Sequence, residues 1–362
     1  MTDDRLPARV RLALQGLVRG AFGPGDDAAL VELPGGASTR RYFRIRAERA
    51  GGAKAAIAMY APEGAKPEEV TAGGAAAPRW PFVEVLELLA ARGVRVPLLL
   101  GDASDDCVLL LEDLGDATLA AVLAREPSRR STLYHRAVRD LAAMHRALEV
   151  LPAGSIVATR AFDQTLLRWE LAHFVEWGLD ARAITRSPAA KRALDEAFDD
   201  VARELADRPR GFVHRDYQSR NLMLDPGGAG RGDPDALVII DFQDALLGPR
   251  AYDLVALLRD SYQDLDETFV AEMIDAYAEA SGMEDAARVS LRDEFDRLTV
   301  QRKLKDAGRF VFIEHKKGDP SFLPFIAPSL ARVRRALERL SSVPTFRTIH
   351  ALLAEALPDS FG

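Results

Sequence analysis

Residues 211–253 constrain the fold of this 362-residue chain more than any other stretch. Short apolar runs alternate there with polar segments, which predicts a strand, a polar loop, a second strand, a turn and a third strand. The first loop is HRDYQSRN, and the last apolar run, ALVII, leads directly into Asp241. Acidic groups therefore stand where the predicted strands end, and Asp216, Asn221 and Asp241 are the first candidates for chemistry.

These three candidates supply the groups that phosphoryl transfer requires. Asp216 can accept the proton of an attacking hydroxyl, while Asn221 offers a neutral oxygen and Asp241 a carboxylate to a divalent cation. Mg²⁺ prefers few carboxylates and adds phosphate oxygens, which suits this sparse set. Each residue alone would be interpreted as an ordinary solvated side chain. Their joint spacing is much rarer and predicts a phosphotransferase that uses a nucleoside triphosphate.

Charge and cysteine content argue against several other classes of function. The formal net charge is −7, which gives no support for nucleic acid or an anionic membrane as the main partner. The only cysteine, Cys107, lies in the apolar run CVLLLED, so we expect it to be buried, without an intramolecular disulfide. The N-terminus lacks a signal-peptide pattern and no apolar run approaches transmembrane length, so we expect a cytoplasmic protein without membrane contact.

The order of the predicted elements indicates an α+β fold with two lobes. The first lobe, residues 1–114, is a small β-rich unit, and the second, residues 115–362, is large and mainly helical. The elements expected in the first lobe are a helix at 5–22, strands at 28–33, 40–47 and 55–61, a loop at 62–79, a helix at 82–93 and two strands between 96 and 113. The helices expected in the second lobe lie at 128–148, 162–179, 188–207, 251–261, 267–281, 285–308, 326–341 and 346–356.

The motifs HRDYQSRN, IIDFQDA and GPRAYDLVALL together resemble the aminoglycoside phosphotransferase and choline kinase-like superfamily. The first two are also similar to protein-kinase loops, but only 12 residues separate Asp241 from Asp253 and no A-P-E element follows, so an activation segment has no room. The resemblance implies a two-lobed, protein-kinase-like fold with ATP and Mg²⁺ as cofactors. It further implies Asp216 as catalytic base, Asn221 and Asp241 as metal ligands, and Asp253 as a buried structural carboxylate.

The same resemblance places the nucleotide on the first lobe. GGASTRRYFRI matches the superfamily's phosphate-binding hairpin, where glycines allow close approach and Ser38, Thr39 and Arg41 can contact phosphate oxygens. LLLEDLG resembles the hinge that meets adenine, with backbone groups near Glu112 and Leu114 as the binding groups.

One usual feature of the superfamily is absent from the third strand. Kinases of this kind carry a lysine there that holds the phosphates, whereas Met59 stands near the expected position. Another basic residue must then take that role. Arg41 and Lys54 are the candidates, and Arg40 could add charge to the hairpin.

Further pieces resemble one branch of the superfamily, the bacterial anomeric kinases of cell-wall recycling. These pieces are STRRYFR, LLLEDLGD, LLRWELAHFVEWGL, FVHRDYQSRNLM and LTVQRKLKDAGRF. Such kinases phosphorylate the C1 hydroxyl of N-acetylmuramate and N-acetylglucosamine, which implies an amino-sugar acceptor with Glu170, His173, Trp177 and Asp244 as candidate contacts. The first three of these can share a helix face. The alternative is an amphipathic helix with Trp177 in the core.

Two interpretations of the late helix and of the acceptor remain open. Arg302, Lys303 and Lys305 could meet the carboxylate of an acidic sugar, but an exposed basic face is the favoured interpretation. An aminoglycoside, choline or another amine is the alternative acceptor, because residues 161–180 are acidic. A pseudokinase scaffold fits less well, since the base and both metal ligands are retained. We expect a monomer that binds a small molecule.

Overall fold

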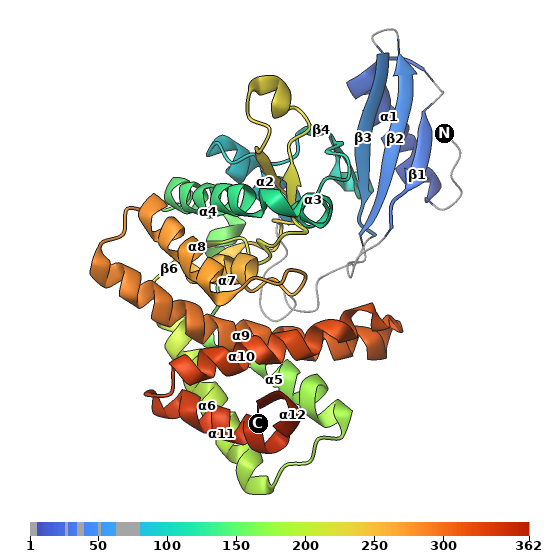
Figure 1. Ribbon diagram of the computed structural model, residues 1–362. Helices are drawn as coiled ribbons and strands as arrows, with labels where there is room; N and C mark the ends of the chain where they lie inside the picture. Colours follow the sequence, from blue (N-terminus) through green and yellow to red (C-terminus); the bar gives the residue numbers. More distant parts are fainter. Residues whose placement is uncertain (1–5, 26–27, 35–39, 50–51, 63–79, 362) are drawn as a thin grey trace.

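A five-stranded antiparallel sheet forms the centre of the first lobe (Figure 1). The computed structural model describes residues 6–25, 28–34, 40–49, 52–62 and 80–361. Ser38 and Thr39, predicted to contact phosphate, lie outside these residues, as does most of the predicted 62–79 loop. The strand order is β1-β2-β3-β5-β4. The elements of this lobe are α1 (Ala8–Phe22), β1 (Ala29–Glu32), β2 (Arg41–Arg49), β3 (Gly52–Tyr60), α2 (Pro81–Ala91), β4 (Leu99–Ala103) and β5 (Val108–Glu112).

The alternation of side chains along β2 gives the two faces of the sheet different partners. Phe43 and Ile45 are fully buried in a core shared with α1. Tyr42 packs instead against the larger core, which includes α2 and continues into the second lobe. Met59 of β3 lies opposite Tyr42 and belongs to the same core. The α1 face of the sheet is therefore a closed core, and the Tyr42 face is the one that looks toward the rest of the molecule.

The second lobe is built from helices around two small β-ribbons. The strands β6 (Arg210–Val213) and β9 (Leu246–Pro249) pair with each other, as do β7 (Leu222–Leu224) and β8 (Leu237–Ile239). The sequence predicted β6, β7 and β8 but not β9. The helices are α3 (Leu119–Arg125), α4 (Arg130–Ala147), α5 (Gln164–His173), α6 (Pro188–Ala206), α7 (Ala251–Leu258), α8 (Glu267–Ala280), α9 (Asp285–Lys317), α10 (Ile326–Arg339), α11 (Pro344–Ala356) and α12 (Pro358–Phe361).

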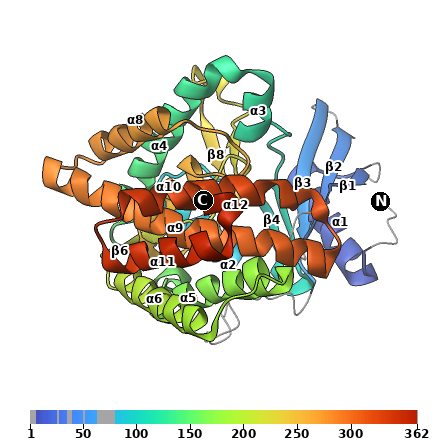
Figure 2. The ribbon, with the colours of Figure 1, turned by 60° about the horizontal axis from the view of Figure 1, so that its bottom comes forward.

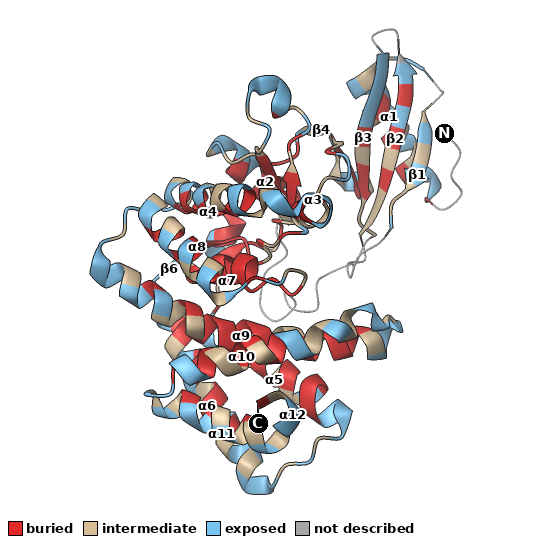
Figure 3. Cartoon of the chain, in the orientation of Figure 1, coloured by how far each residue is buried: buried red, intermediate tan, exposed pale blue. Residues whose placement is uncertain are grey.

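The long helix α9 crosses the middle of the second lobe (Figures 1 and 2). It contacts α7 on the side of the β-ribbons and α5 and α10 on the other side. The helices α6, α11 and α12 complete the lower group of Figure 1. Every residue of α7 is buried, which Figure 3 shows as a red helix beside the ribbons. Within the described residues, no helix is long and apolar enough to cross a membrane.

Two predicted helices differ from the structure near the place where α9 crosses residues 173 and 174. The sequence predicted that one helix ends at Gly308, but α9 continues to Lys317. A Cβ at Gly308 would lie 2.8 Å from the Cα of Phe174, so this glycine allows two backbones to approach and does not end a helix. The helix predicted at 162–179 is α-helical only to His173 and then becomes a π-helix, Phe174–Leu179. The close crossing with α9 lies where that change begins.

Candidate active site

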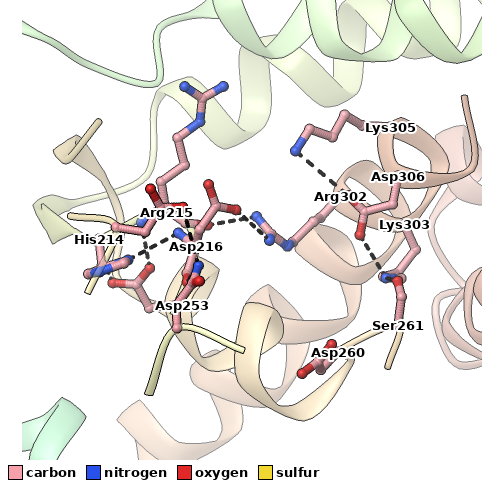
Figure 4. Close-up of polar contacts among 12 residues, drawn as sticks. His214, Arg215, Asp216, Asp253, Asp260, Ser261, Arg302, Lys303, Lys305 and Asp306 are labelled. Atoms are coloured by element: carbon pink, nitrogen blue, oxygen red, sulfur yellow. Dashed lines mark hydrogen bonds and ion pairs between the residues drawn. The ribbon is translucent and has the colours of Figure 1, made fainter. Parts of the chain in front are cut away.

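A buried carboxylate holds the loop that follows β6. Asp253 is fully buried, and its two oxygens accept the backbone N–H groups of His214 at 2.7 Å and Arg215 at 2.9 Å. Nε2 of the buried His145 lies 3.3 Å from the same carboxylate. Asp253 therefore lies where the resemblance implied, and it fixes the backbone immediately before Asp216 (Figure 4).

Replacing Asp253 with Ala is expected to lower the free energy of unfolding by about 3–5 kcal/mol, because two backbone donors and His145 lose a buried charged partner. Urea unfolding followed by circular dichroism measures this change. The matched control is Asp200→Ala, which removes an exposed carboxylate paired only with Arg203 at the surface and should cost about 1 kcal/mol or less. Equal effects of the two substitutions would contradict the structural role of Asp253.

Asp216 lies at the centre of a charged cluster between the loop and α9. Its Oδ1 accepts a hydrogen bond of 3.1 Å from Nη2 of Arg302, while Nη1 of Arg302 donates to the carbonyl of Arg215 at 2.8 Å (Figure 4). Burial would raise the pKa of Asp216, but the charges of Arg302, Lys305 and Arg215 outweigh it and hold the pKa below its ordinary value. Asp216 is therefore an oriented carboxylate that is ionised at neutral pH.

Asn221 and Asp241 lie together next to Asp216. Nδ2 of Asn221 donates to the carbonyl of Asp216 at 2.9 Å and lies 3.5 Å from Oδ2 of Asp241. This use of the amide nitrogen leaves the Asn221 carbonyl oxygen for a cation. The Asp241 side chain is 43% exposed, so one carboxylate and one amide oxygen face a space that a ligand can reach.

This oxygen pair fits Mg²⁺ and not a cation that requires a full protein cage. The described residues contain no group of three or more histidine, cysteine or carboxylate side chains arranged to hold a metal. Mg²⁺ is typically bound by one or two carboxylates, with waters and substrate phosphates as its remaining ligands. Two residues of the site also adopt left-handed backbone conformations, Arg215 with φ of 81° and Asp241 with φ of 65°. Such conformations cluster at functional sites.

The structure removes one candidate for the missing phosphate-binding lysine. Met59 is buried in the inter-lobe core, so the third strand offers no cation there. Lys54 is exposed near the hairpin end of β3. Along the strand it alternates with Met59, on the same side as Ala56 and Ala58, which are buried against α1. Lys54 therefore faces away from the site.

Arg40, which precedes β2, and Arg41, the first residue of β2, point in opposite directions. Nε of Arg41 pairs with Glu32 at 2.8 Å, and its guanidinium lies 5.1 Å from the Phe43 ring, on the α1 side of the sheet. Arg40 reaches the second lobe, where Nη1 lies 3.5 Å from Oδ1 of Asp241 and Nη2 lies 3.6 Å from Oδ2 of Asp244. The structure thus brings Arg40, and not Arg41, to the carboxylates of the site.

The two predicted hinge residues have different surroundings. The Glu112 carboxylate forms hydrogen bonds of 2.7 and 2.8 Å with Arg95, and its backbone N–H donates to the Leu98 carbonyl. Neither group is available to adenine in this arrangement. Leu114 is buried against Met223 and Val238, and its backbone N–H has no hydrogen-bond partner among residues 80–361. Leu114 remains the candidate for a backbone contact to the base.

The predicted acceptor residue Glu170 lies in the interior. Its side chain has no exposed surface, Oε1 pairs with Arg215 at 3.1 Å, and Oε2 accepts a hydrogen bond of 2.7 Å from Gln301. A sugar hydroxyl has no access to this carboxylate. Glu170 instead anchors the Arg215 side chain behind the loop that holds Asp216.

The other three acceptor candidates also have protein partners. His173 stacks on Trp169 with ring centroids 5.5 Å apart, and Trp177 meets Phe312 edge-to-face at 5.2 Å. Trp177 is 9% exposed, so the structure favours the interpretation in which it packs in an apolar cluster. Asp244 lies in the metal loop, where it accepts a hydrogen bond of 2.8 Å from Gln243. His173 and Trp177 therefore contact neighbouring aromatic side chains, whereas Asp244 lies in the metal loop.

The late helix supplies functional groups that the sequence interpretation placed in solvent. Arg302 and Lys303 are 3% and 1% exposed, so the expected exposed basic face is wrong at these positions. Arg302 contacts Asp216 across 86 positions of sequence, a distance over which neither periodicity nor motif spacing carries information.

Comparisons with known proteins agree with this chemistry. Residues 29–291 match the model of a phosphotransferase enzyme family. An N-acetylmuramate/N-acetylglucosamine kinase of Pseudomonas aeruginosa is 33% identical over 314 residues, which cover 83% of this chain and 82% of that protein. A protein of the same name from Neisseria meningitidis serogroup B is 30% identical over 342 residues and 93% of both chains.

Solved structures show the same fold at low identity. A choline kinase from Cryptosporidium parvum aligns with a TM-score of 0.59 at 11% identity, covering 94% of this chain and 98% of that chain. The streptomycin-ATP-APH(2″)-IIa ternary complex aligns with a TM-score of 0.54 at 14% identity, covering 90% and 97%. These alignments confirm the predicted two-lobed, aminoglycoside phosphotransferase-type fold.

Proposed function

Because the chain belongs to the phosphotransferase enzyme family, we propose that it transfers the γ-phosphoryl group of ATP to the C1 hydroxyl of N-acetylmuramate and N-acetylglucosamine. The observation that carries this proposal is the identity of 30–33% with two kinases named for these sugars, over most of each chain. The product is a sugar 1-phosphate, and we place the reaction in peptidoglycan recycling. A cytoplasmic location and a monomeric state are parts of the proposal, since ATP is the donor and one chain supplies every proposed site residue.

The loop geometry supports Asp216 as the base of this reaction. The anomeric oxygen attacks the γ-phosphorus in line, a new O–P bond forms, the bond to the β,γ-bridging oxygen breaks, and the hydroxyl proton passes to Asp216. Arg302 fixes one carboxylate oxygen of Asp216, which leaves the other for the acceptor. An anomeric hydroxyl is more acidic than an ordinary alcohol, so a carboxylate with a low pKa is a sufficient base.

Asn221 and Asp241 would hold Mg²⁺. When bound, the cation neutralises charge on the phosphate groups. The pair supplies two oxygen ligands, and the Arg40 guanidinium that lies 3.5 Å from Asp241 shows that this position attracts positive charge. The remaining ligands of the cation would be waters and phosphate oxygens.

We propose that Arg40 takes the role of the missing third-strand lysine. Arg40→Met is then expected to weaken ATP binding about tenfold, because a charged contact to phosphate is lost. Calorimetric titration of the nucleotide measures this without turnover. Arg46→Met, which removes an exposed arginine of β2, is the matched control and should bind nucleotide normally. Unchanged nucleotide affinity of Arg40→Met would contradict this assignment.

An amine acceptor is the second candidate, and the structure weakens its basis. Three of the acidic residues of 161–180 that suggested it have other partners, while Glu176 is exposed. Asp163 accepts the N–H of Leu166 at the start of α5, Glu170 is buried, and Asp180 pairs with Arg186 at 2.6 Å. The charges that lower the pKa of Asp216 are those of Arg302 and Lys305 on α9 and of the neighbouring Arg215, and all three are positive. A cationic acceptor would meet repulsion there.

An acceptor panel tests the proposed function. The protein is incubated with Mg-ATP and N-acetylmuramate, N-acetylglucosamine, kanamycin or choline, and ADP release is measured. We expect release with the two sugars and not with the amines. Release only with an amine would replace the sugar proposal, and no release with any acceptor would favour the pseudokinase scaffold.

A further inference from the structure

Helix α9 places three basic side chains near Asp216, and their distances to carboxylate oxygens differ. Arg302 pairs with Asp216 at 3.1 Å. Lys303 lies 2.7 Å from Oδ2 of Asp306 and donates to the Ser261 hydroxyl at 2.5 Å. Lys305 lies 3.6 Å from Oδ1 of the same Asp306 (Figure 4). Lys305 therefore has the weakest contact of the three.

Among the ion pairs of the described residues, Lys305 shares its carboxylate, Asp306, with Lys303, which lies closer to it. Three cations of α9 share the two carboxylates of Asp216 and Asp306. The neighbouring Arg215 does not change the balance, because Glu170 matches it. A nearly buried cation that lacks a full partner is costly, so such an excess indicates a place for an anion.

Lys305 is the cation that a ligand can reach. Its side chain is 12% exposed, whereas those of Lys303 and Arg302 are 1% and 4% exposed. Burial opposes its charge, but Tyr252, Glu170 and Asp306 outweigh burial and raise the pKa of Lys305, so its ammonium group is charged at neutral pH. Lys305 follows Arg302, which pairs with Asp216, by three residues on α9 and so lies on the same face of the helix. The ammonium is thus a charged donor at the edge of the proposed acceptor site.

We propose that Lys305 binds the lactyl carboxylate of N-acetylmuramate and thereby favours the acidic sugar over N-acetylglucosamine. This inference rests on the proposed function. The lactyl group is attached at C3 of the ring, two carbons from the reacting C1. Lys305 follows Arg302, which orients the base for C1, by three residues, or about 4.5 Å along the helix axis. The two cations therefore lie about one helical turn apart on one face of α9, a separation that the substituents at C1 and C3 of one sugar ring can span.

Steady-state kinetics with two acceptors test the role of Lys305. For Lys305→Met we expect kcat/KM for N-acetylmuramate to fall about 10- to 100-fold, mainly through KM, because a charge-assisted contact is lost. We expect kcat/KM for N-acetylglucosamine to fall by no more than about fivefold, since this sugar has no carboxylate and loses only the effect of the Lys305 charge on Asp216. Lys305→Arg keeps the charge and should recover most of the loss. Lys191→Met, an exposed lysine of α6, is the control for a general effect of removing charge.

A neutral substrate separates this role from a contact with phosphate. In Lys305→Met the carboxamide of N-acetylmuramate should lose no more activity than N-acetylglucosamine does, so that the enzyme change and the substrate change are not additive. Equal loss with both natural sugars would overturn the proposal, because it would assign Lys305 to phosphoryl transfer or to folding. Unchanged kinetics with N-acetylmuramate would overturn it as well. The proposed function fails separately, and only if the wild type phosphorylates neither sugar.

Discussion

Asp216→Asn is expected to lower kcat about 100- to 10,000-fold, the range that a positioned general base contributes. The substitution keeps the size of the side chain and one oxygen for Arg302, but an amide cannot accept the proton of the acceptor. Because Asp216 is proposed to contact the acceptor and not the nucleotide, the affinity for ATP should change little. Rapid-quench turnover and calorimetric ATP binding measure the two quantities.

The control for this prediction is Asp105→Asn, which changes an exposed carboxylate of the first lobe. It should leave both kcat and ATP affinity at the wild-type level. Turnover by Asp216→Asn at more than about a tenth of the wild-type rate would contradict the role of Asp216 as base.

Asp241→Asn is expected to lower kcat about 1,000-fold at millimolar Mg²⁺, since charge stabilisation by a catalytic metal is worth several kcal/mol. The concentration of Mg²⁺ that gives half-maximal rate should rise at the same time. Calorimetric titration of Mg²⁺ in the presence of ADP provides a second measurement that does not depend on turnover.

Thermal unfolding separates loss of the metal from loss of the fold. The Asp241 side chain is 43% exposed and its loss leaves no buried cavity, so the midpoint should move by only a few degrees. An unchanged dependence on Mg²⁺ would contradict Asp241 as a ligand, whatever the change in rate.

Contiguous motifs explain why the central stretch could be predicted from the sequence. Asp216 and Asn221 lie five positions apart on one loop, and Asp241 ends the next buried strand, so local spacing brings the three side chains together. The predicted strands β6, β7 and β8 are present. The role of Asp253 was implied by the family resemblance, and in the structure α7, which begins just after β9, carries this carboxylate into the core beneath the loop.

The sequence alone did not determine to which face of its element a side chain points. Neighbouring residues of a strand point to opposite faces of the sheet. The sequence RRYFR alone therefore did not indicate whether Arg40 or Arg41 contacts the metal loop. On α9, charged residues at 302, 303 and 305 indicate a solvated face by ordinary statistics. Their burial depends on Asp216 and Asp306, and only the folded chain brings Asp216 to the helix.

Tertiary contacts also determine the role of Gly308 and the type of helix that follows His173. Gly308 would end many helices, but here it lets α9 pass against the backbone of Phe174. The same crossing coincides with the change from α-helix to π-helix after His173, which redirects the side chains that follow. Glu170 and Trp177 both contact α9, through Gln301 and Phe312, and are buried there.

The position of the new phosphate tests the central claim most directly. N-acetylmuramate is incubated with the protein and Mg-ATP, the product is isolated, and its phosphate release in dilute acid and its reducing end are measured. The account predicts a product that has lost its reducing end and releases phosphate in mild acid, as a glycosyl phosphate does. An acid-stable phosphate on a sugar that still has its reducing end would show transfer to another hydroxyl and would contradict the account.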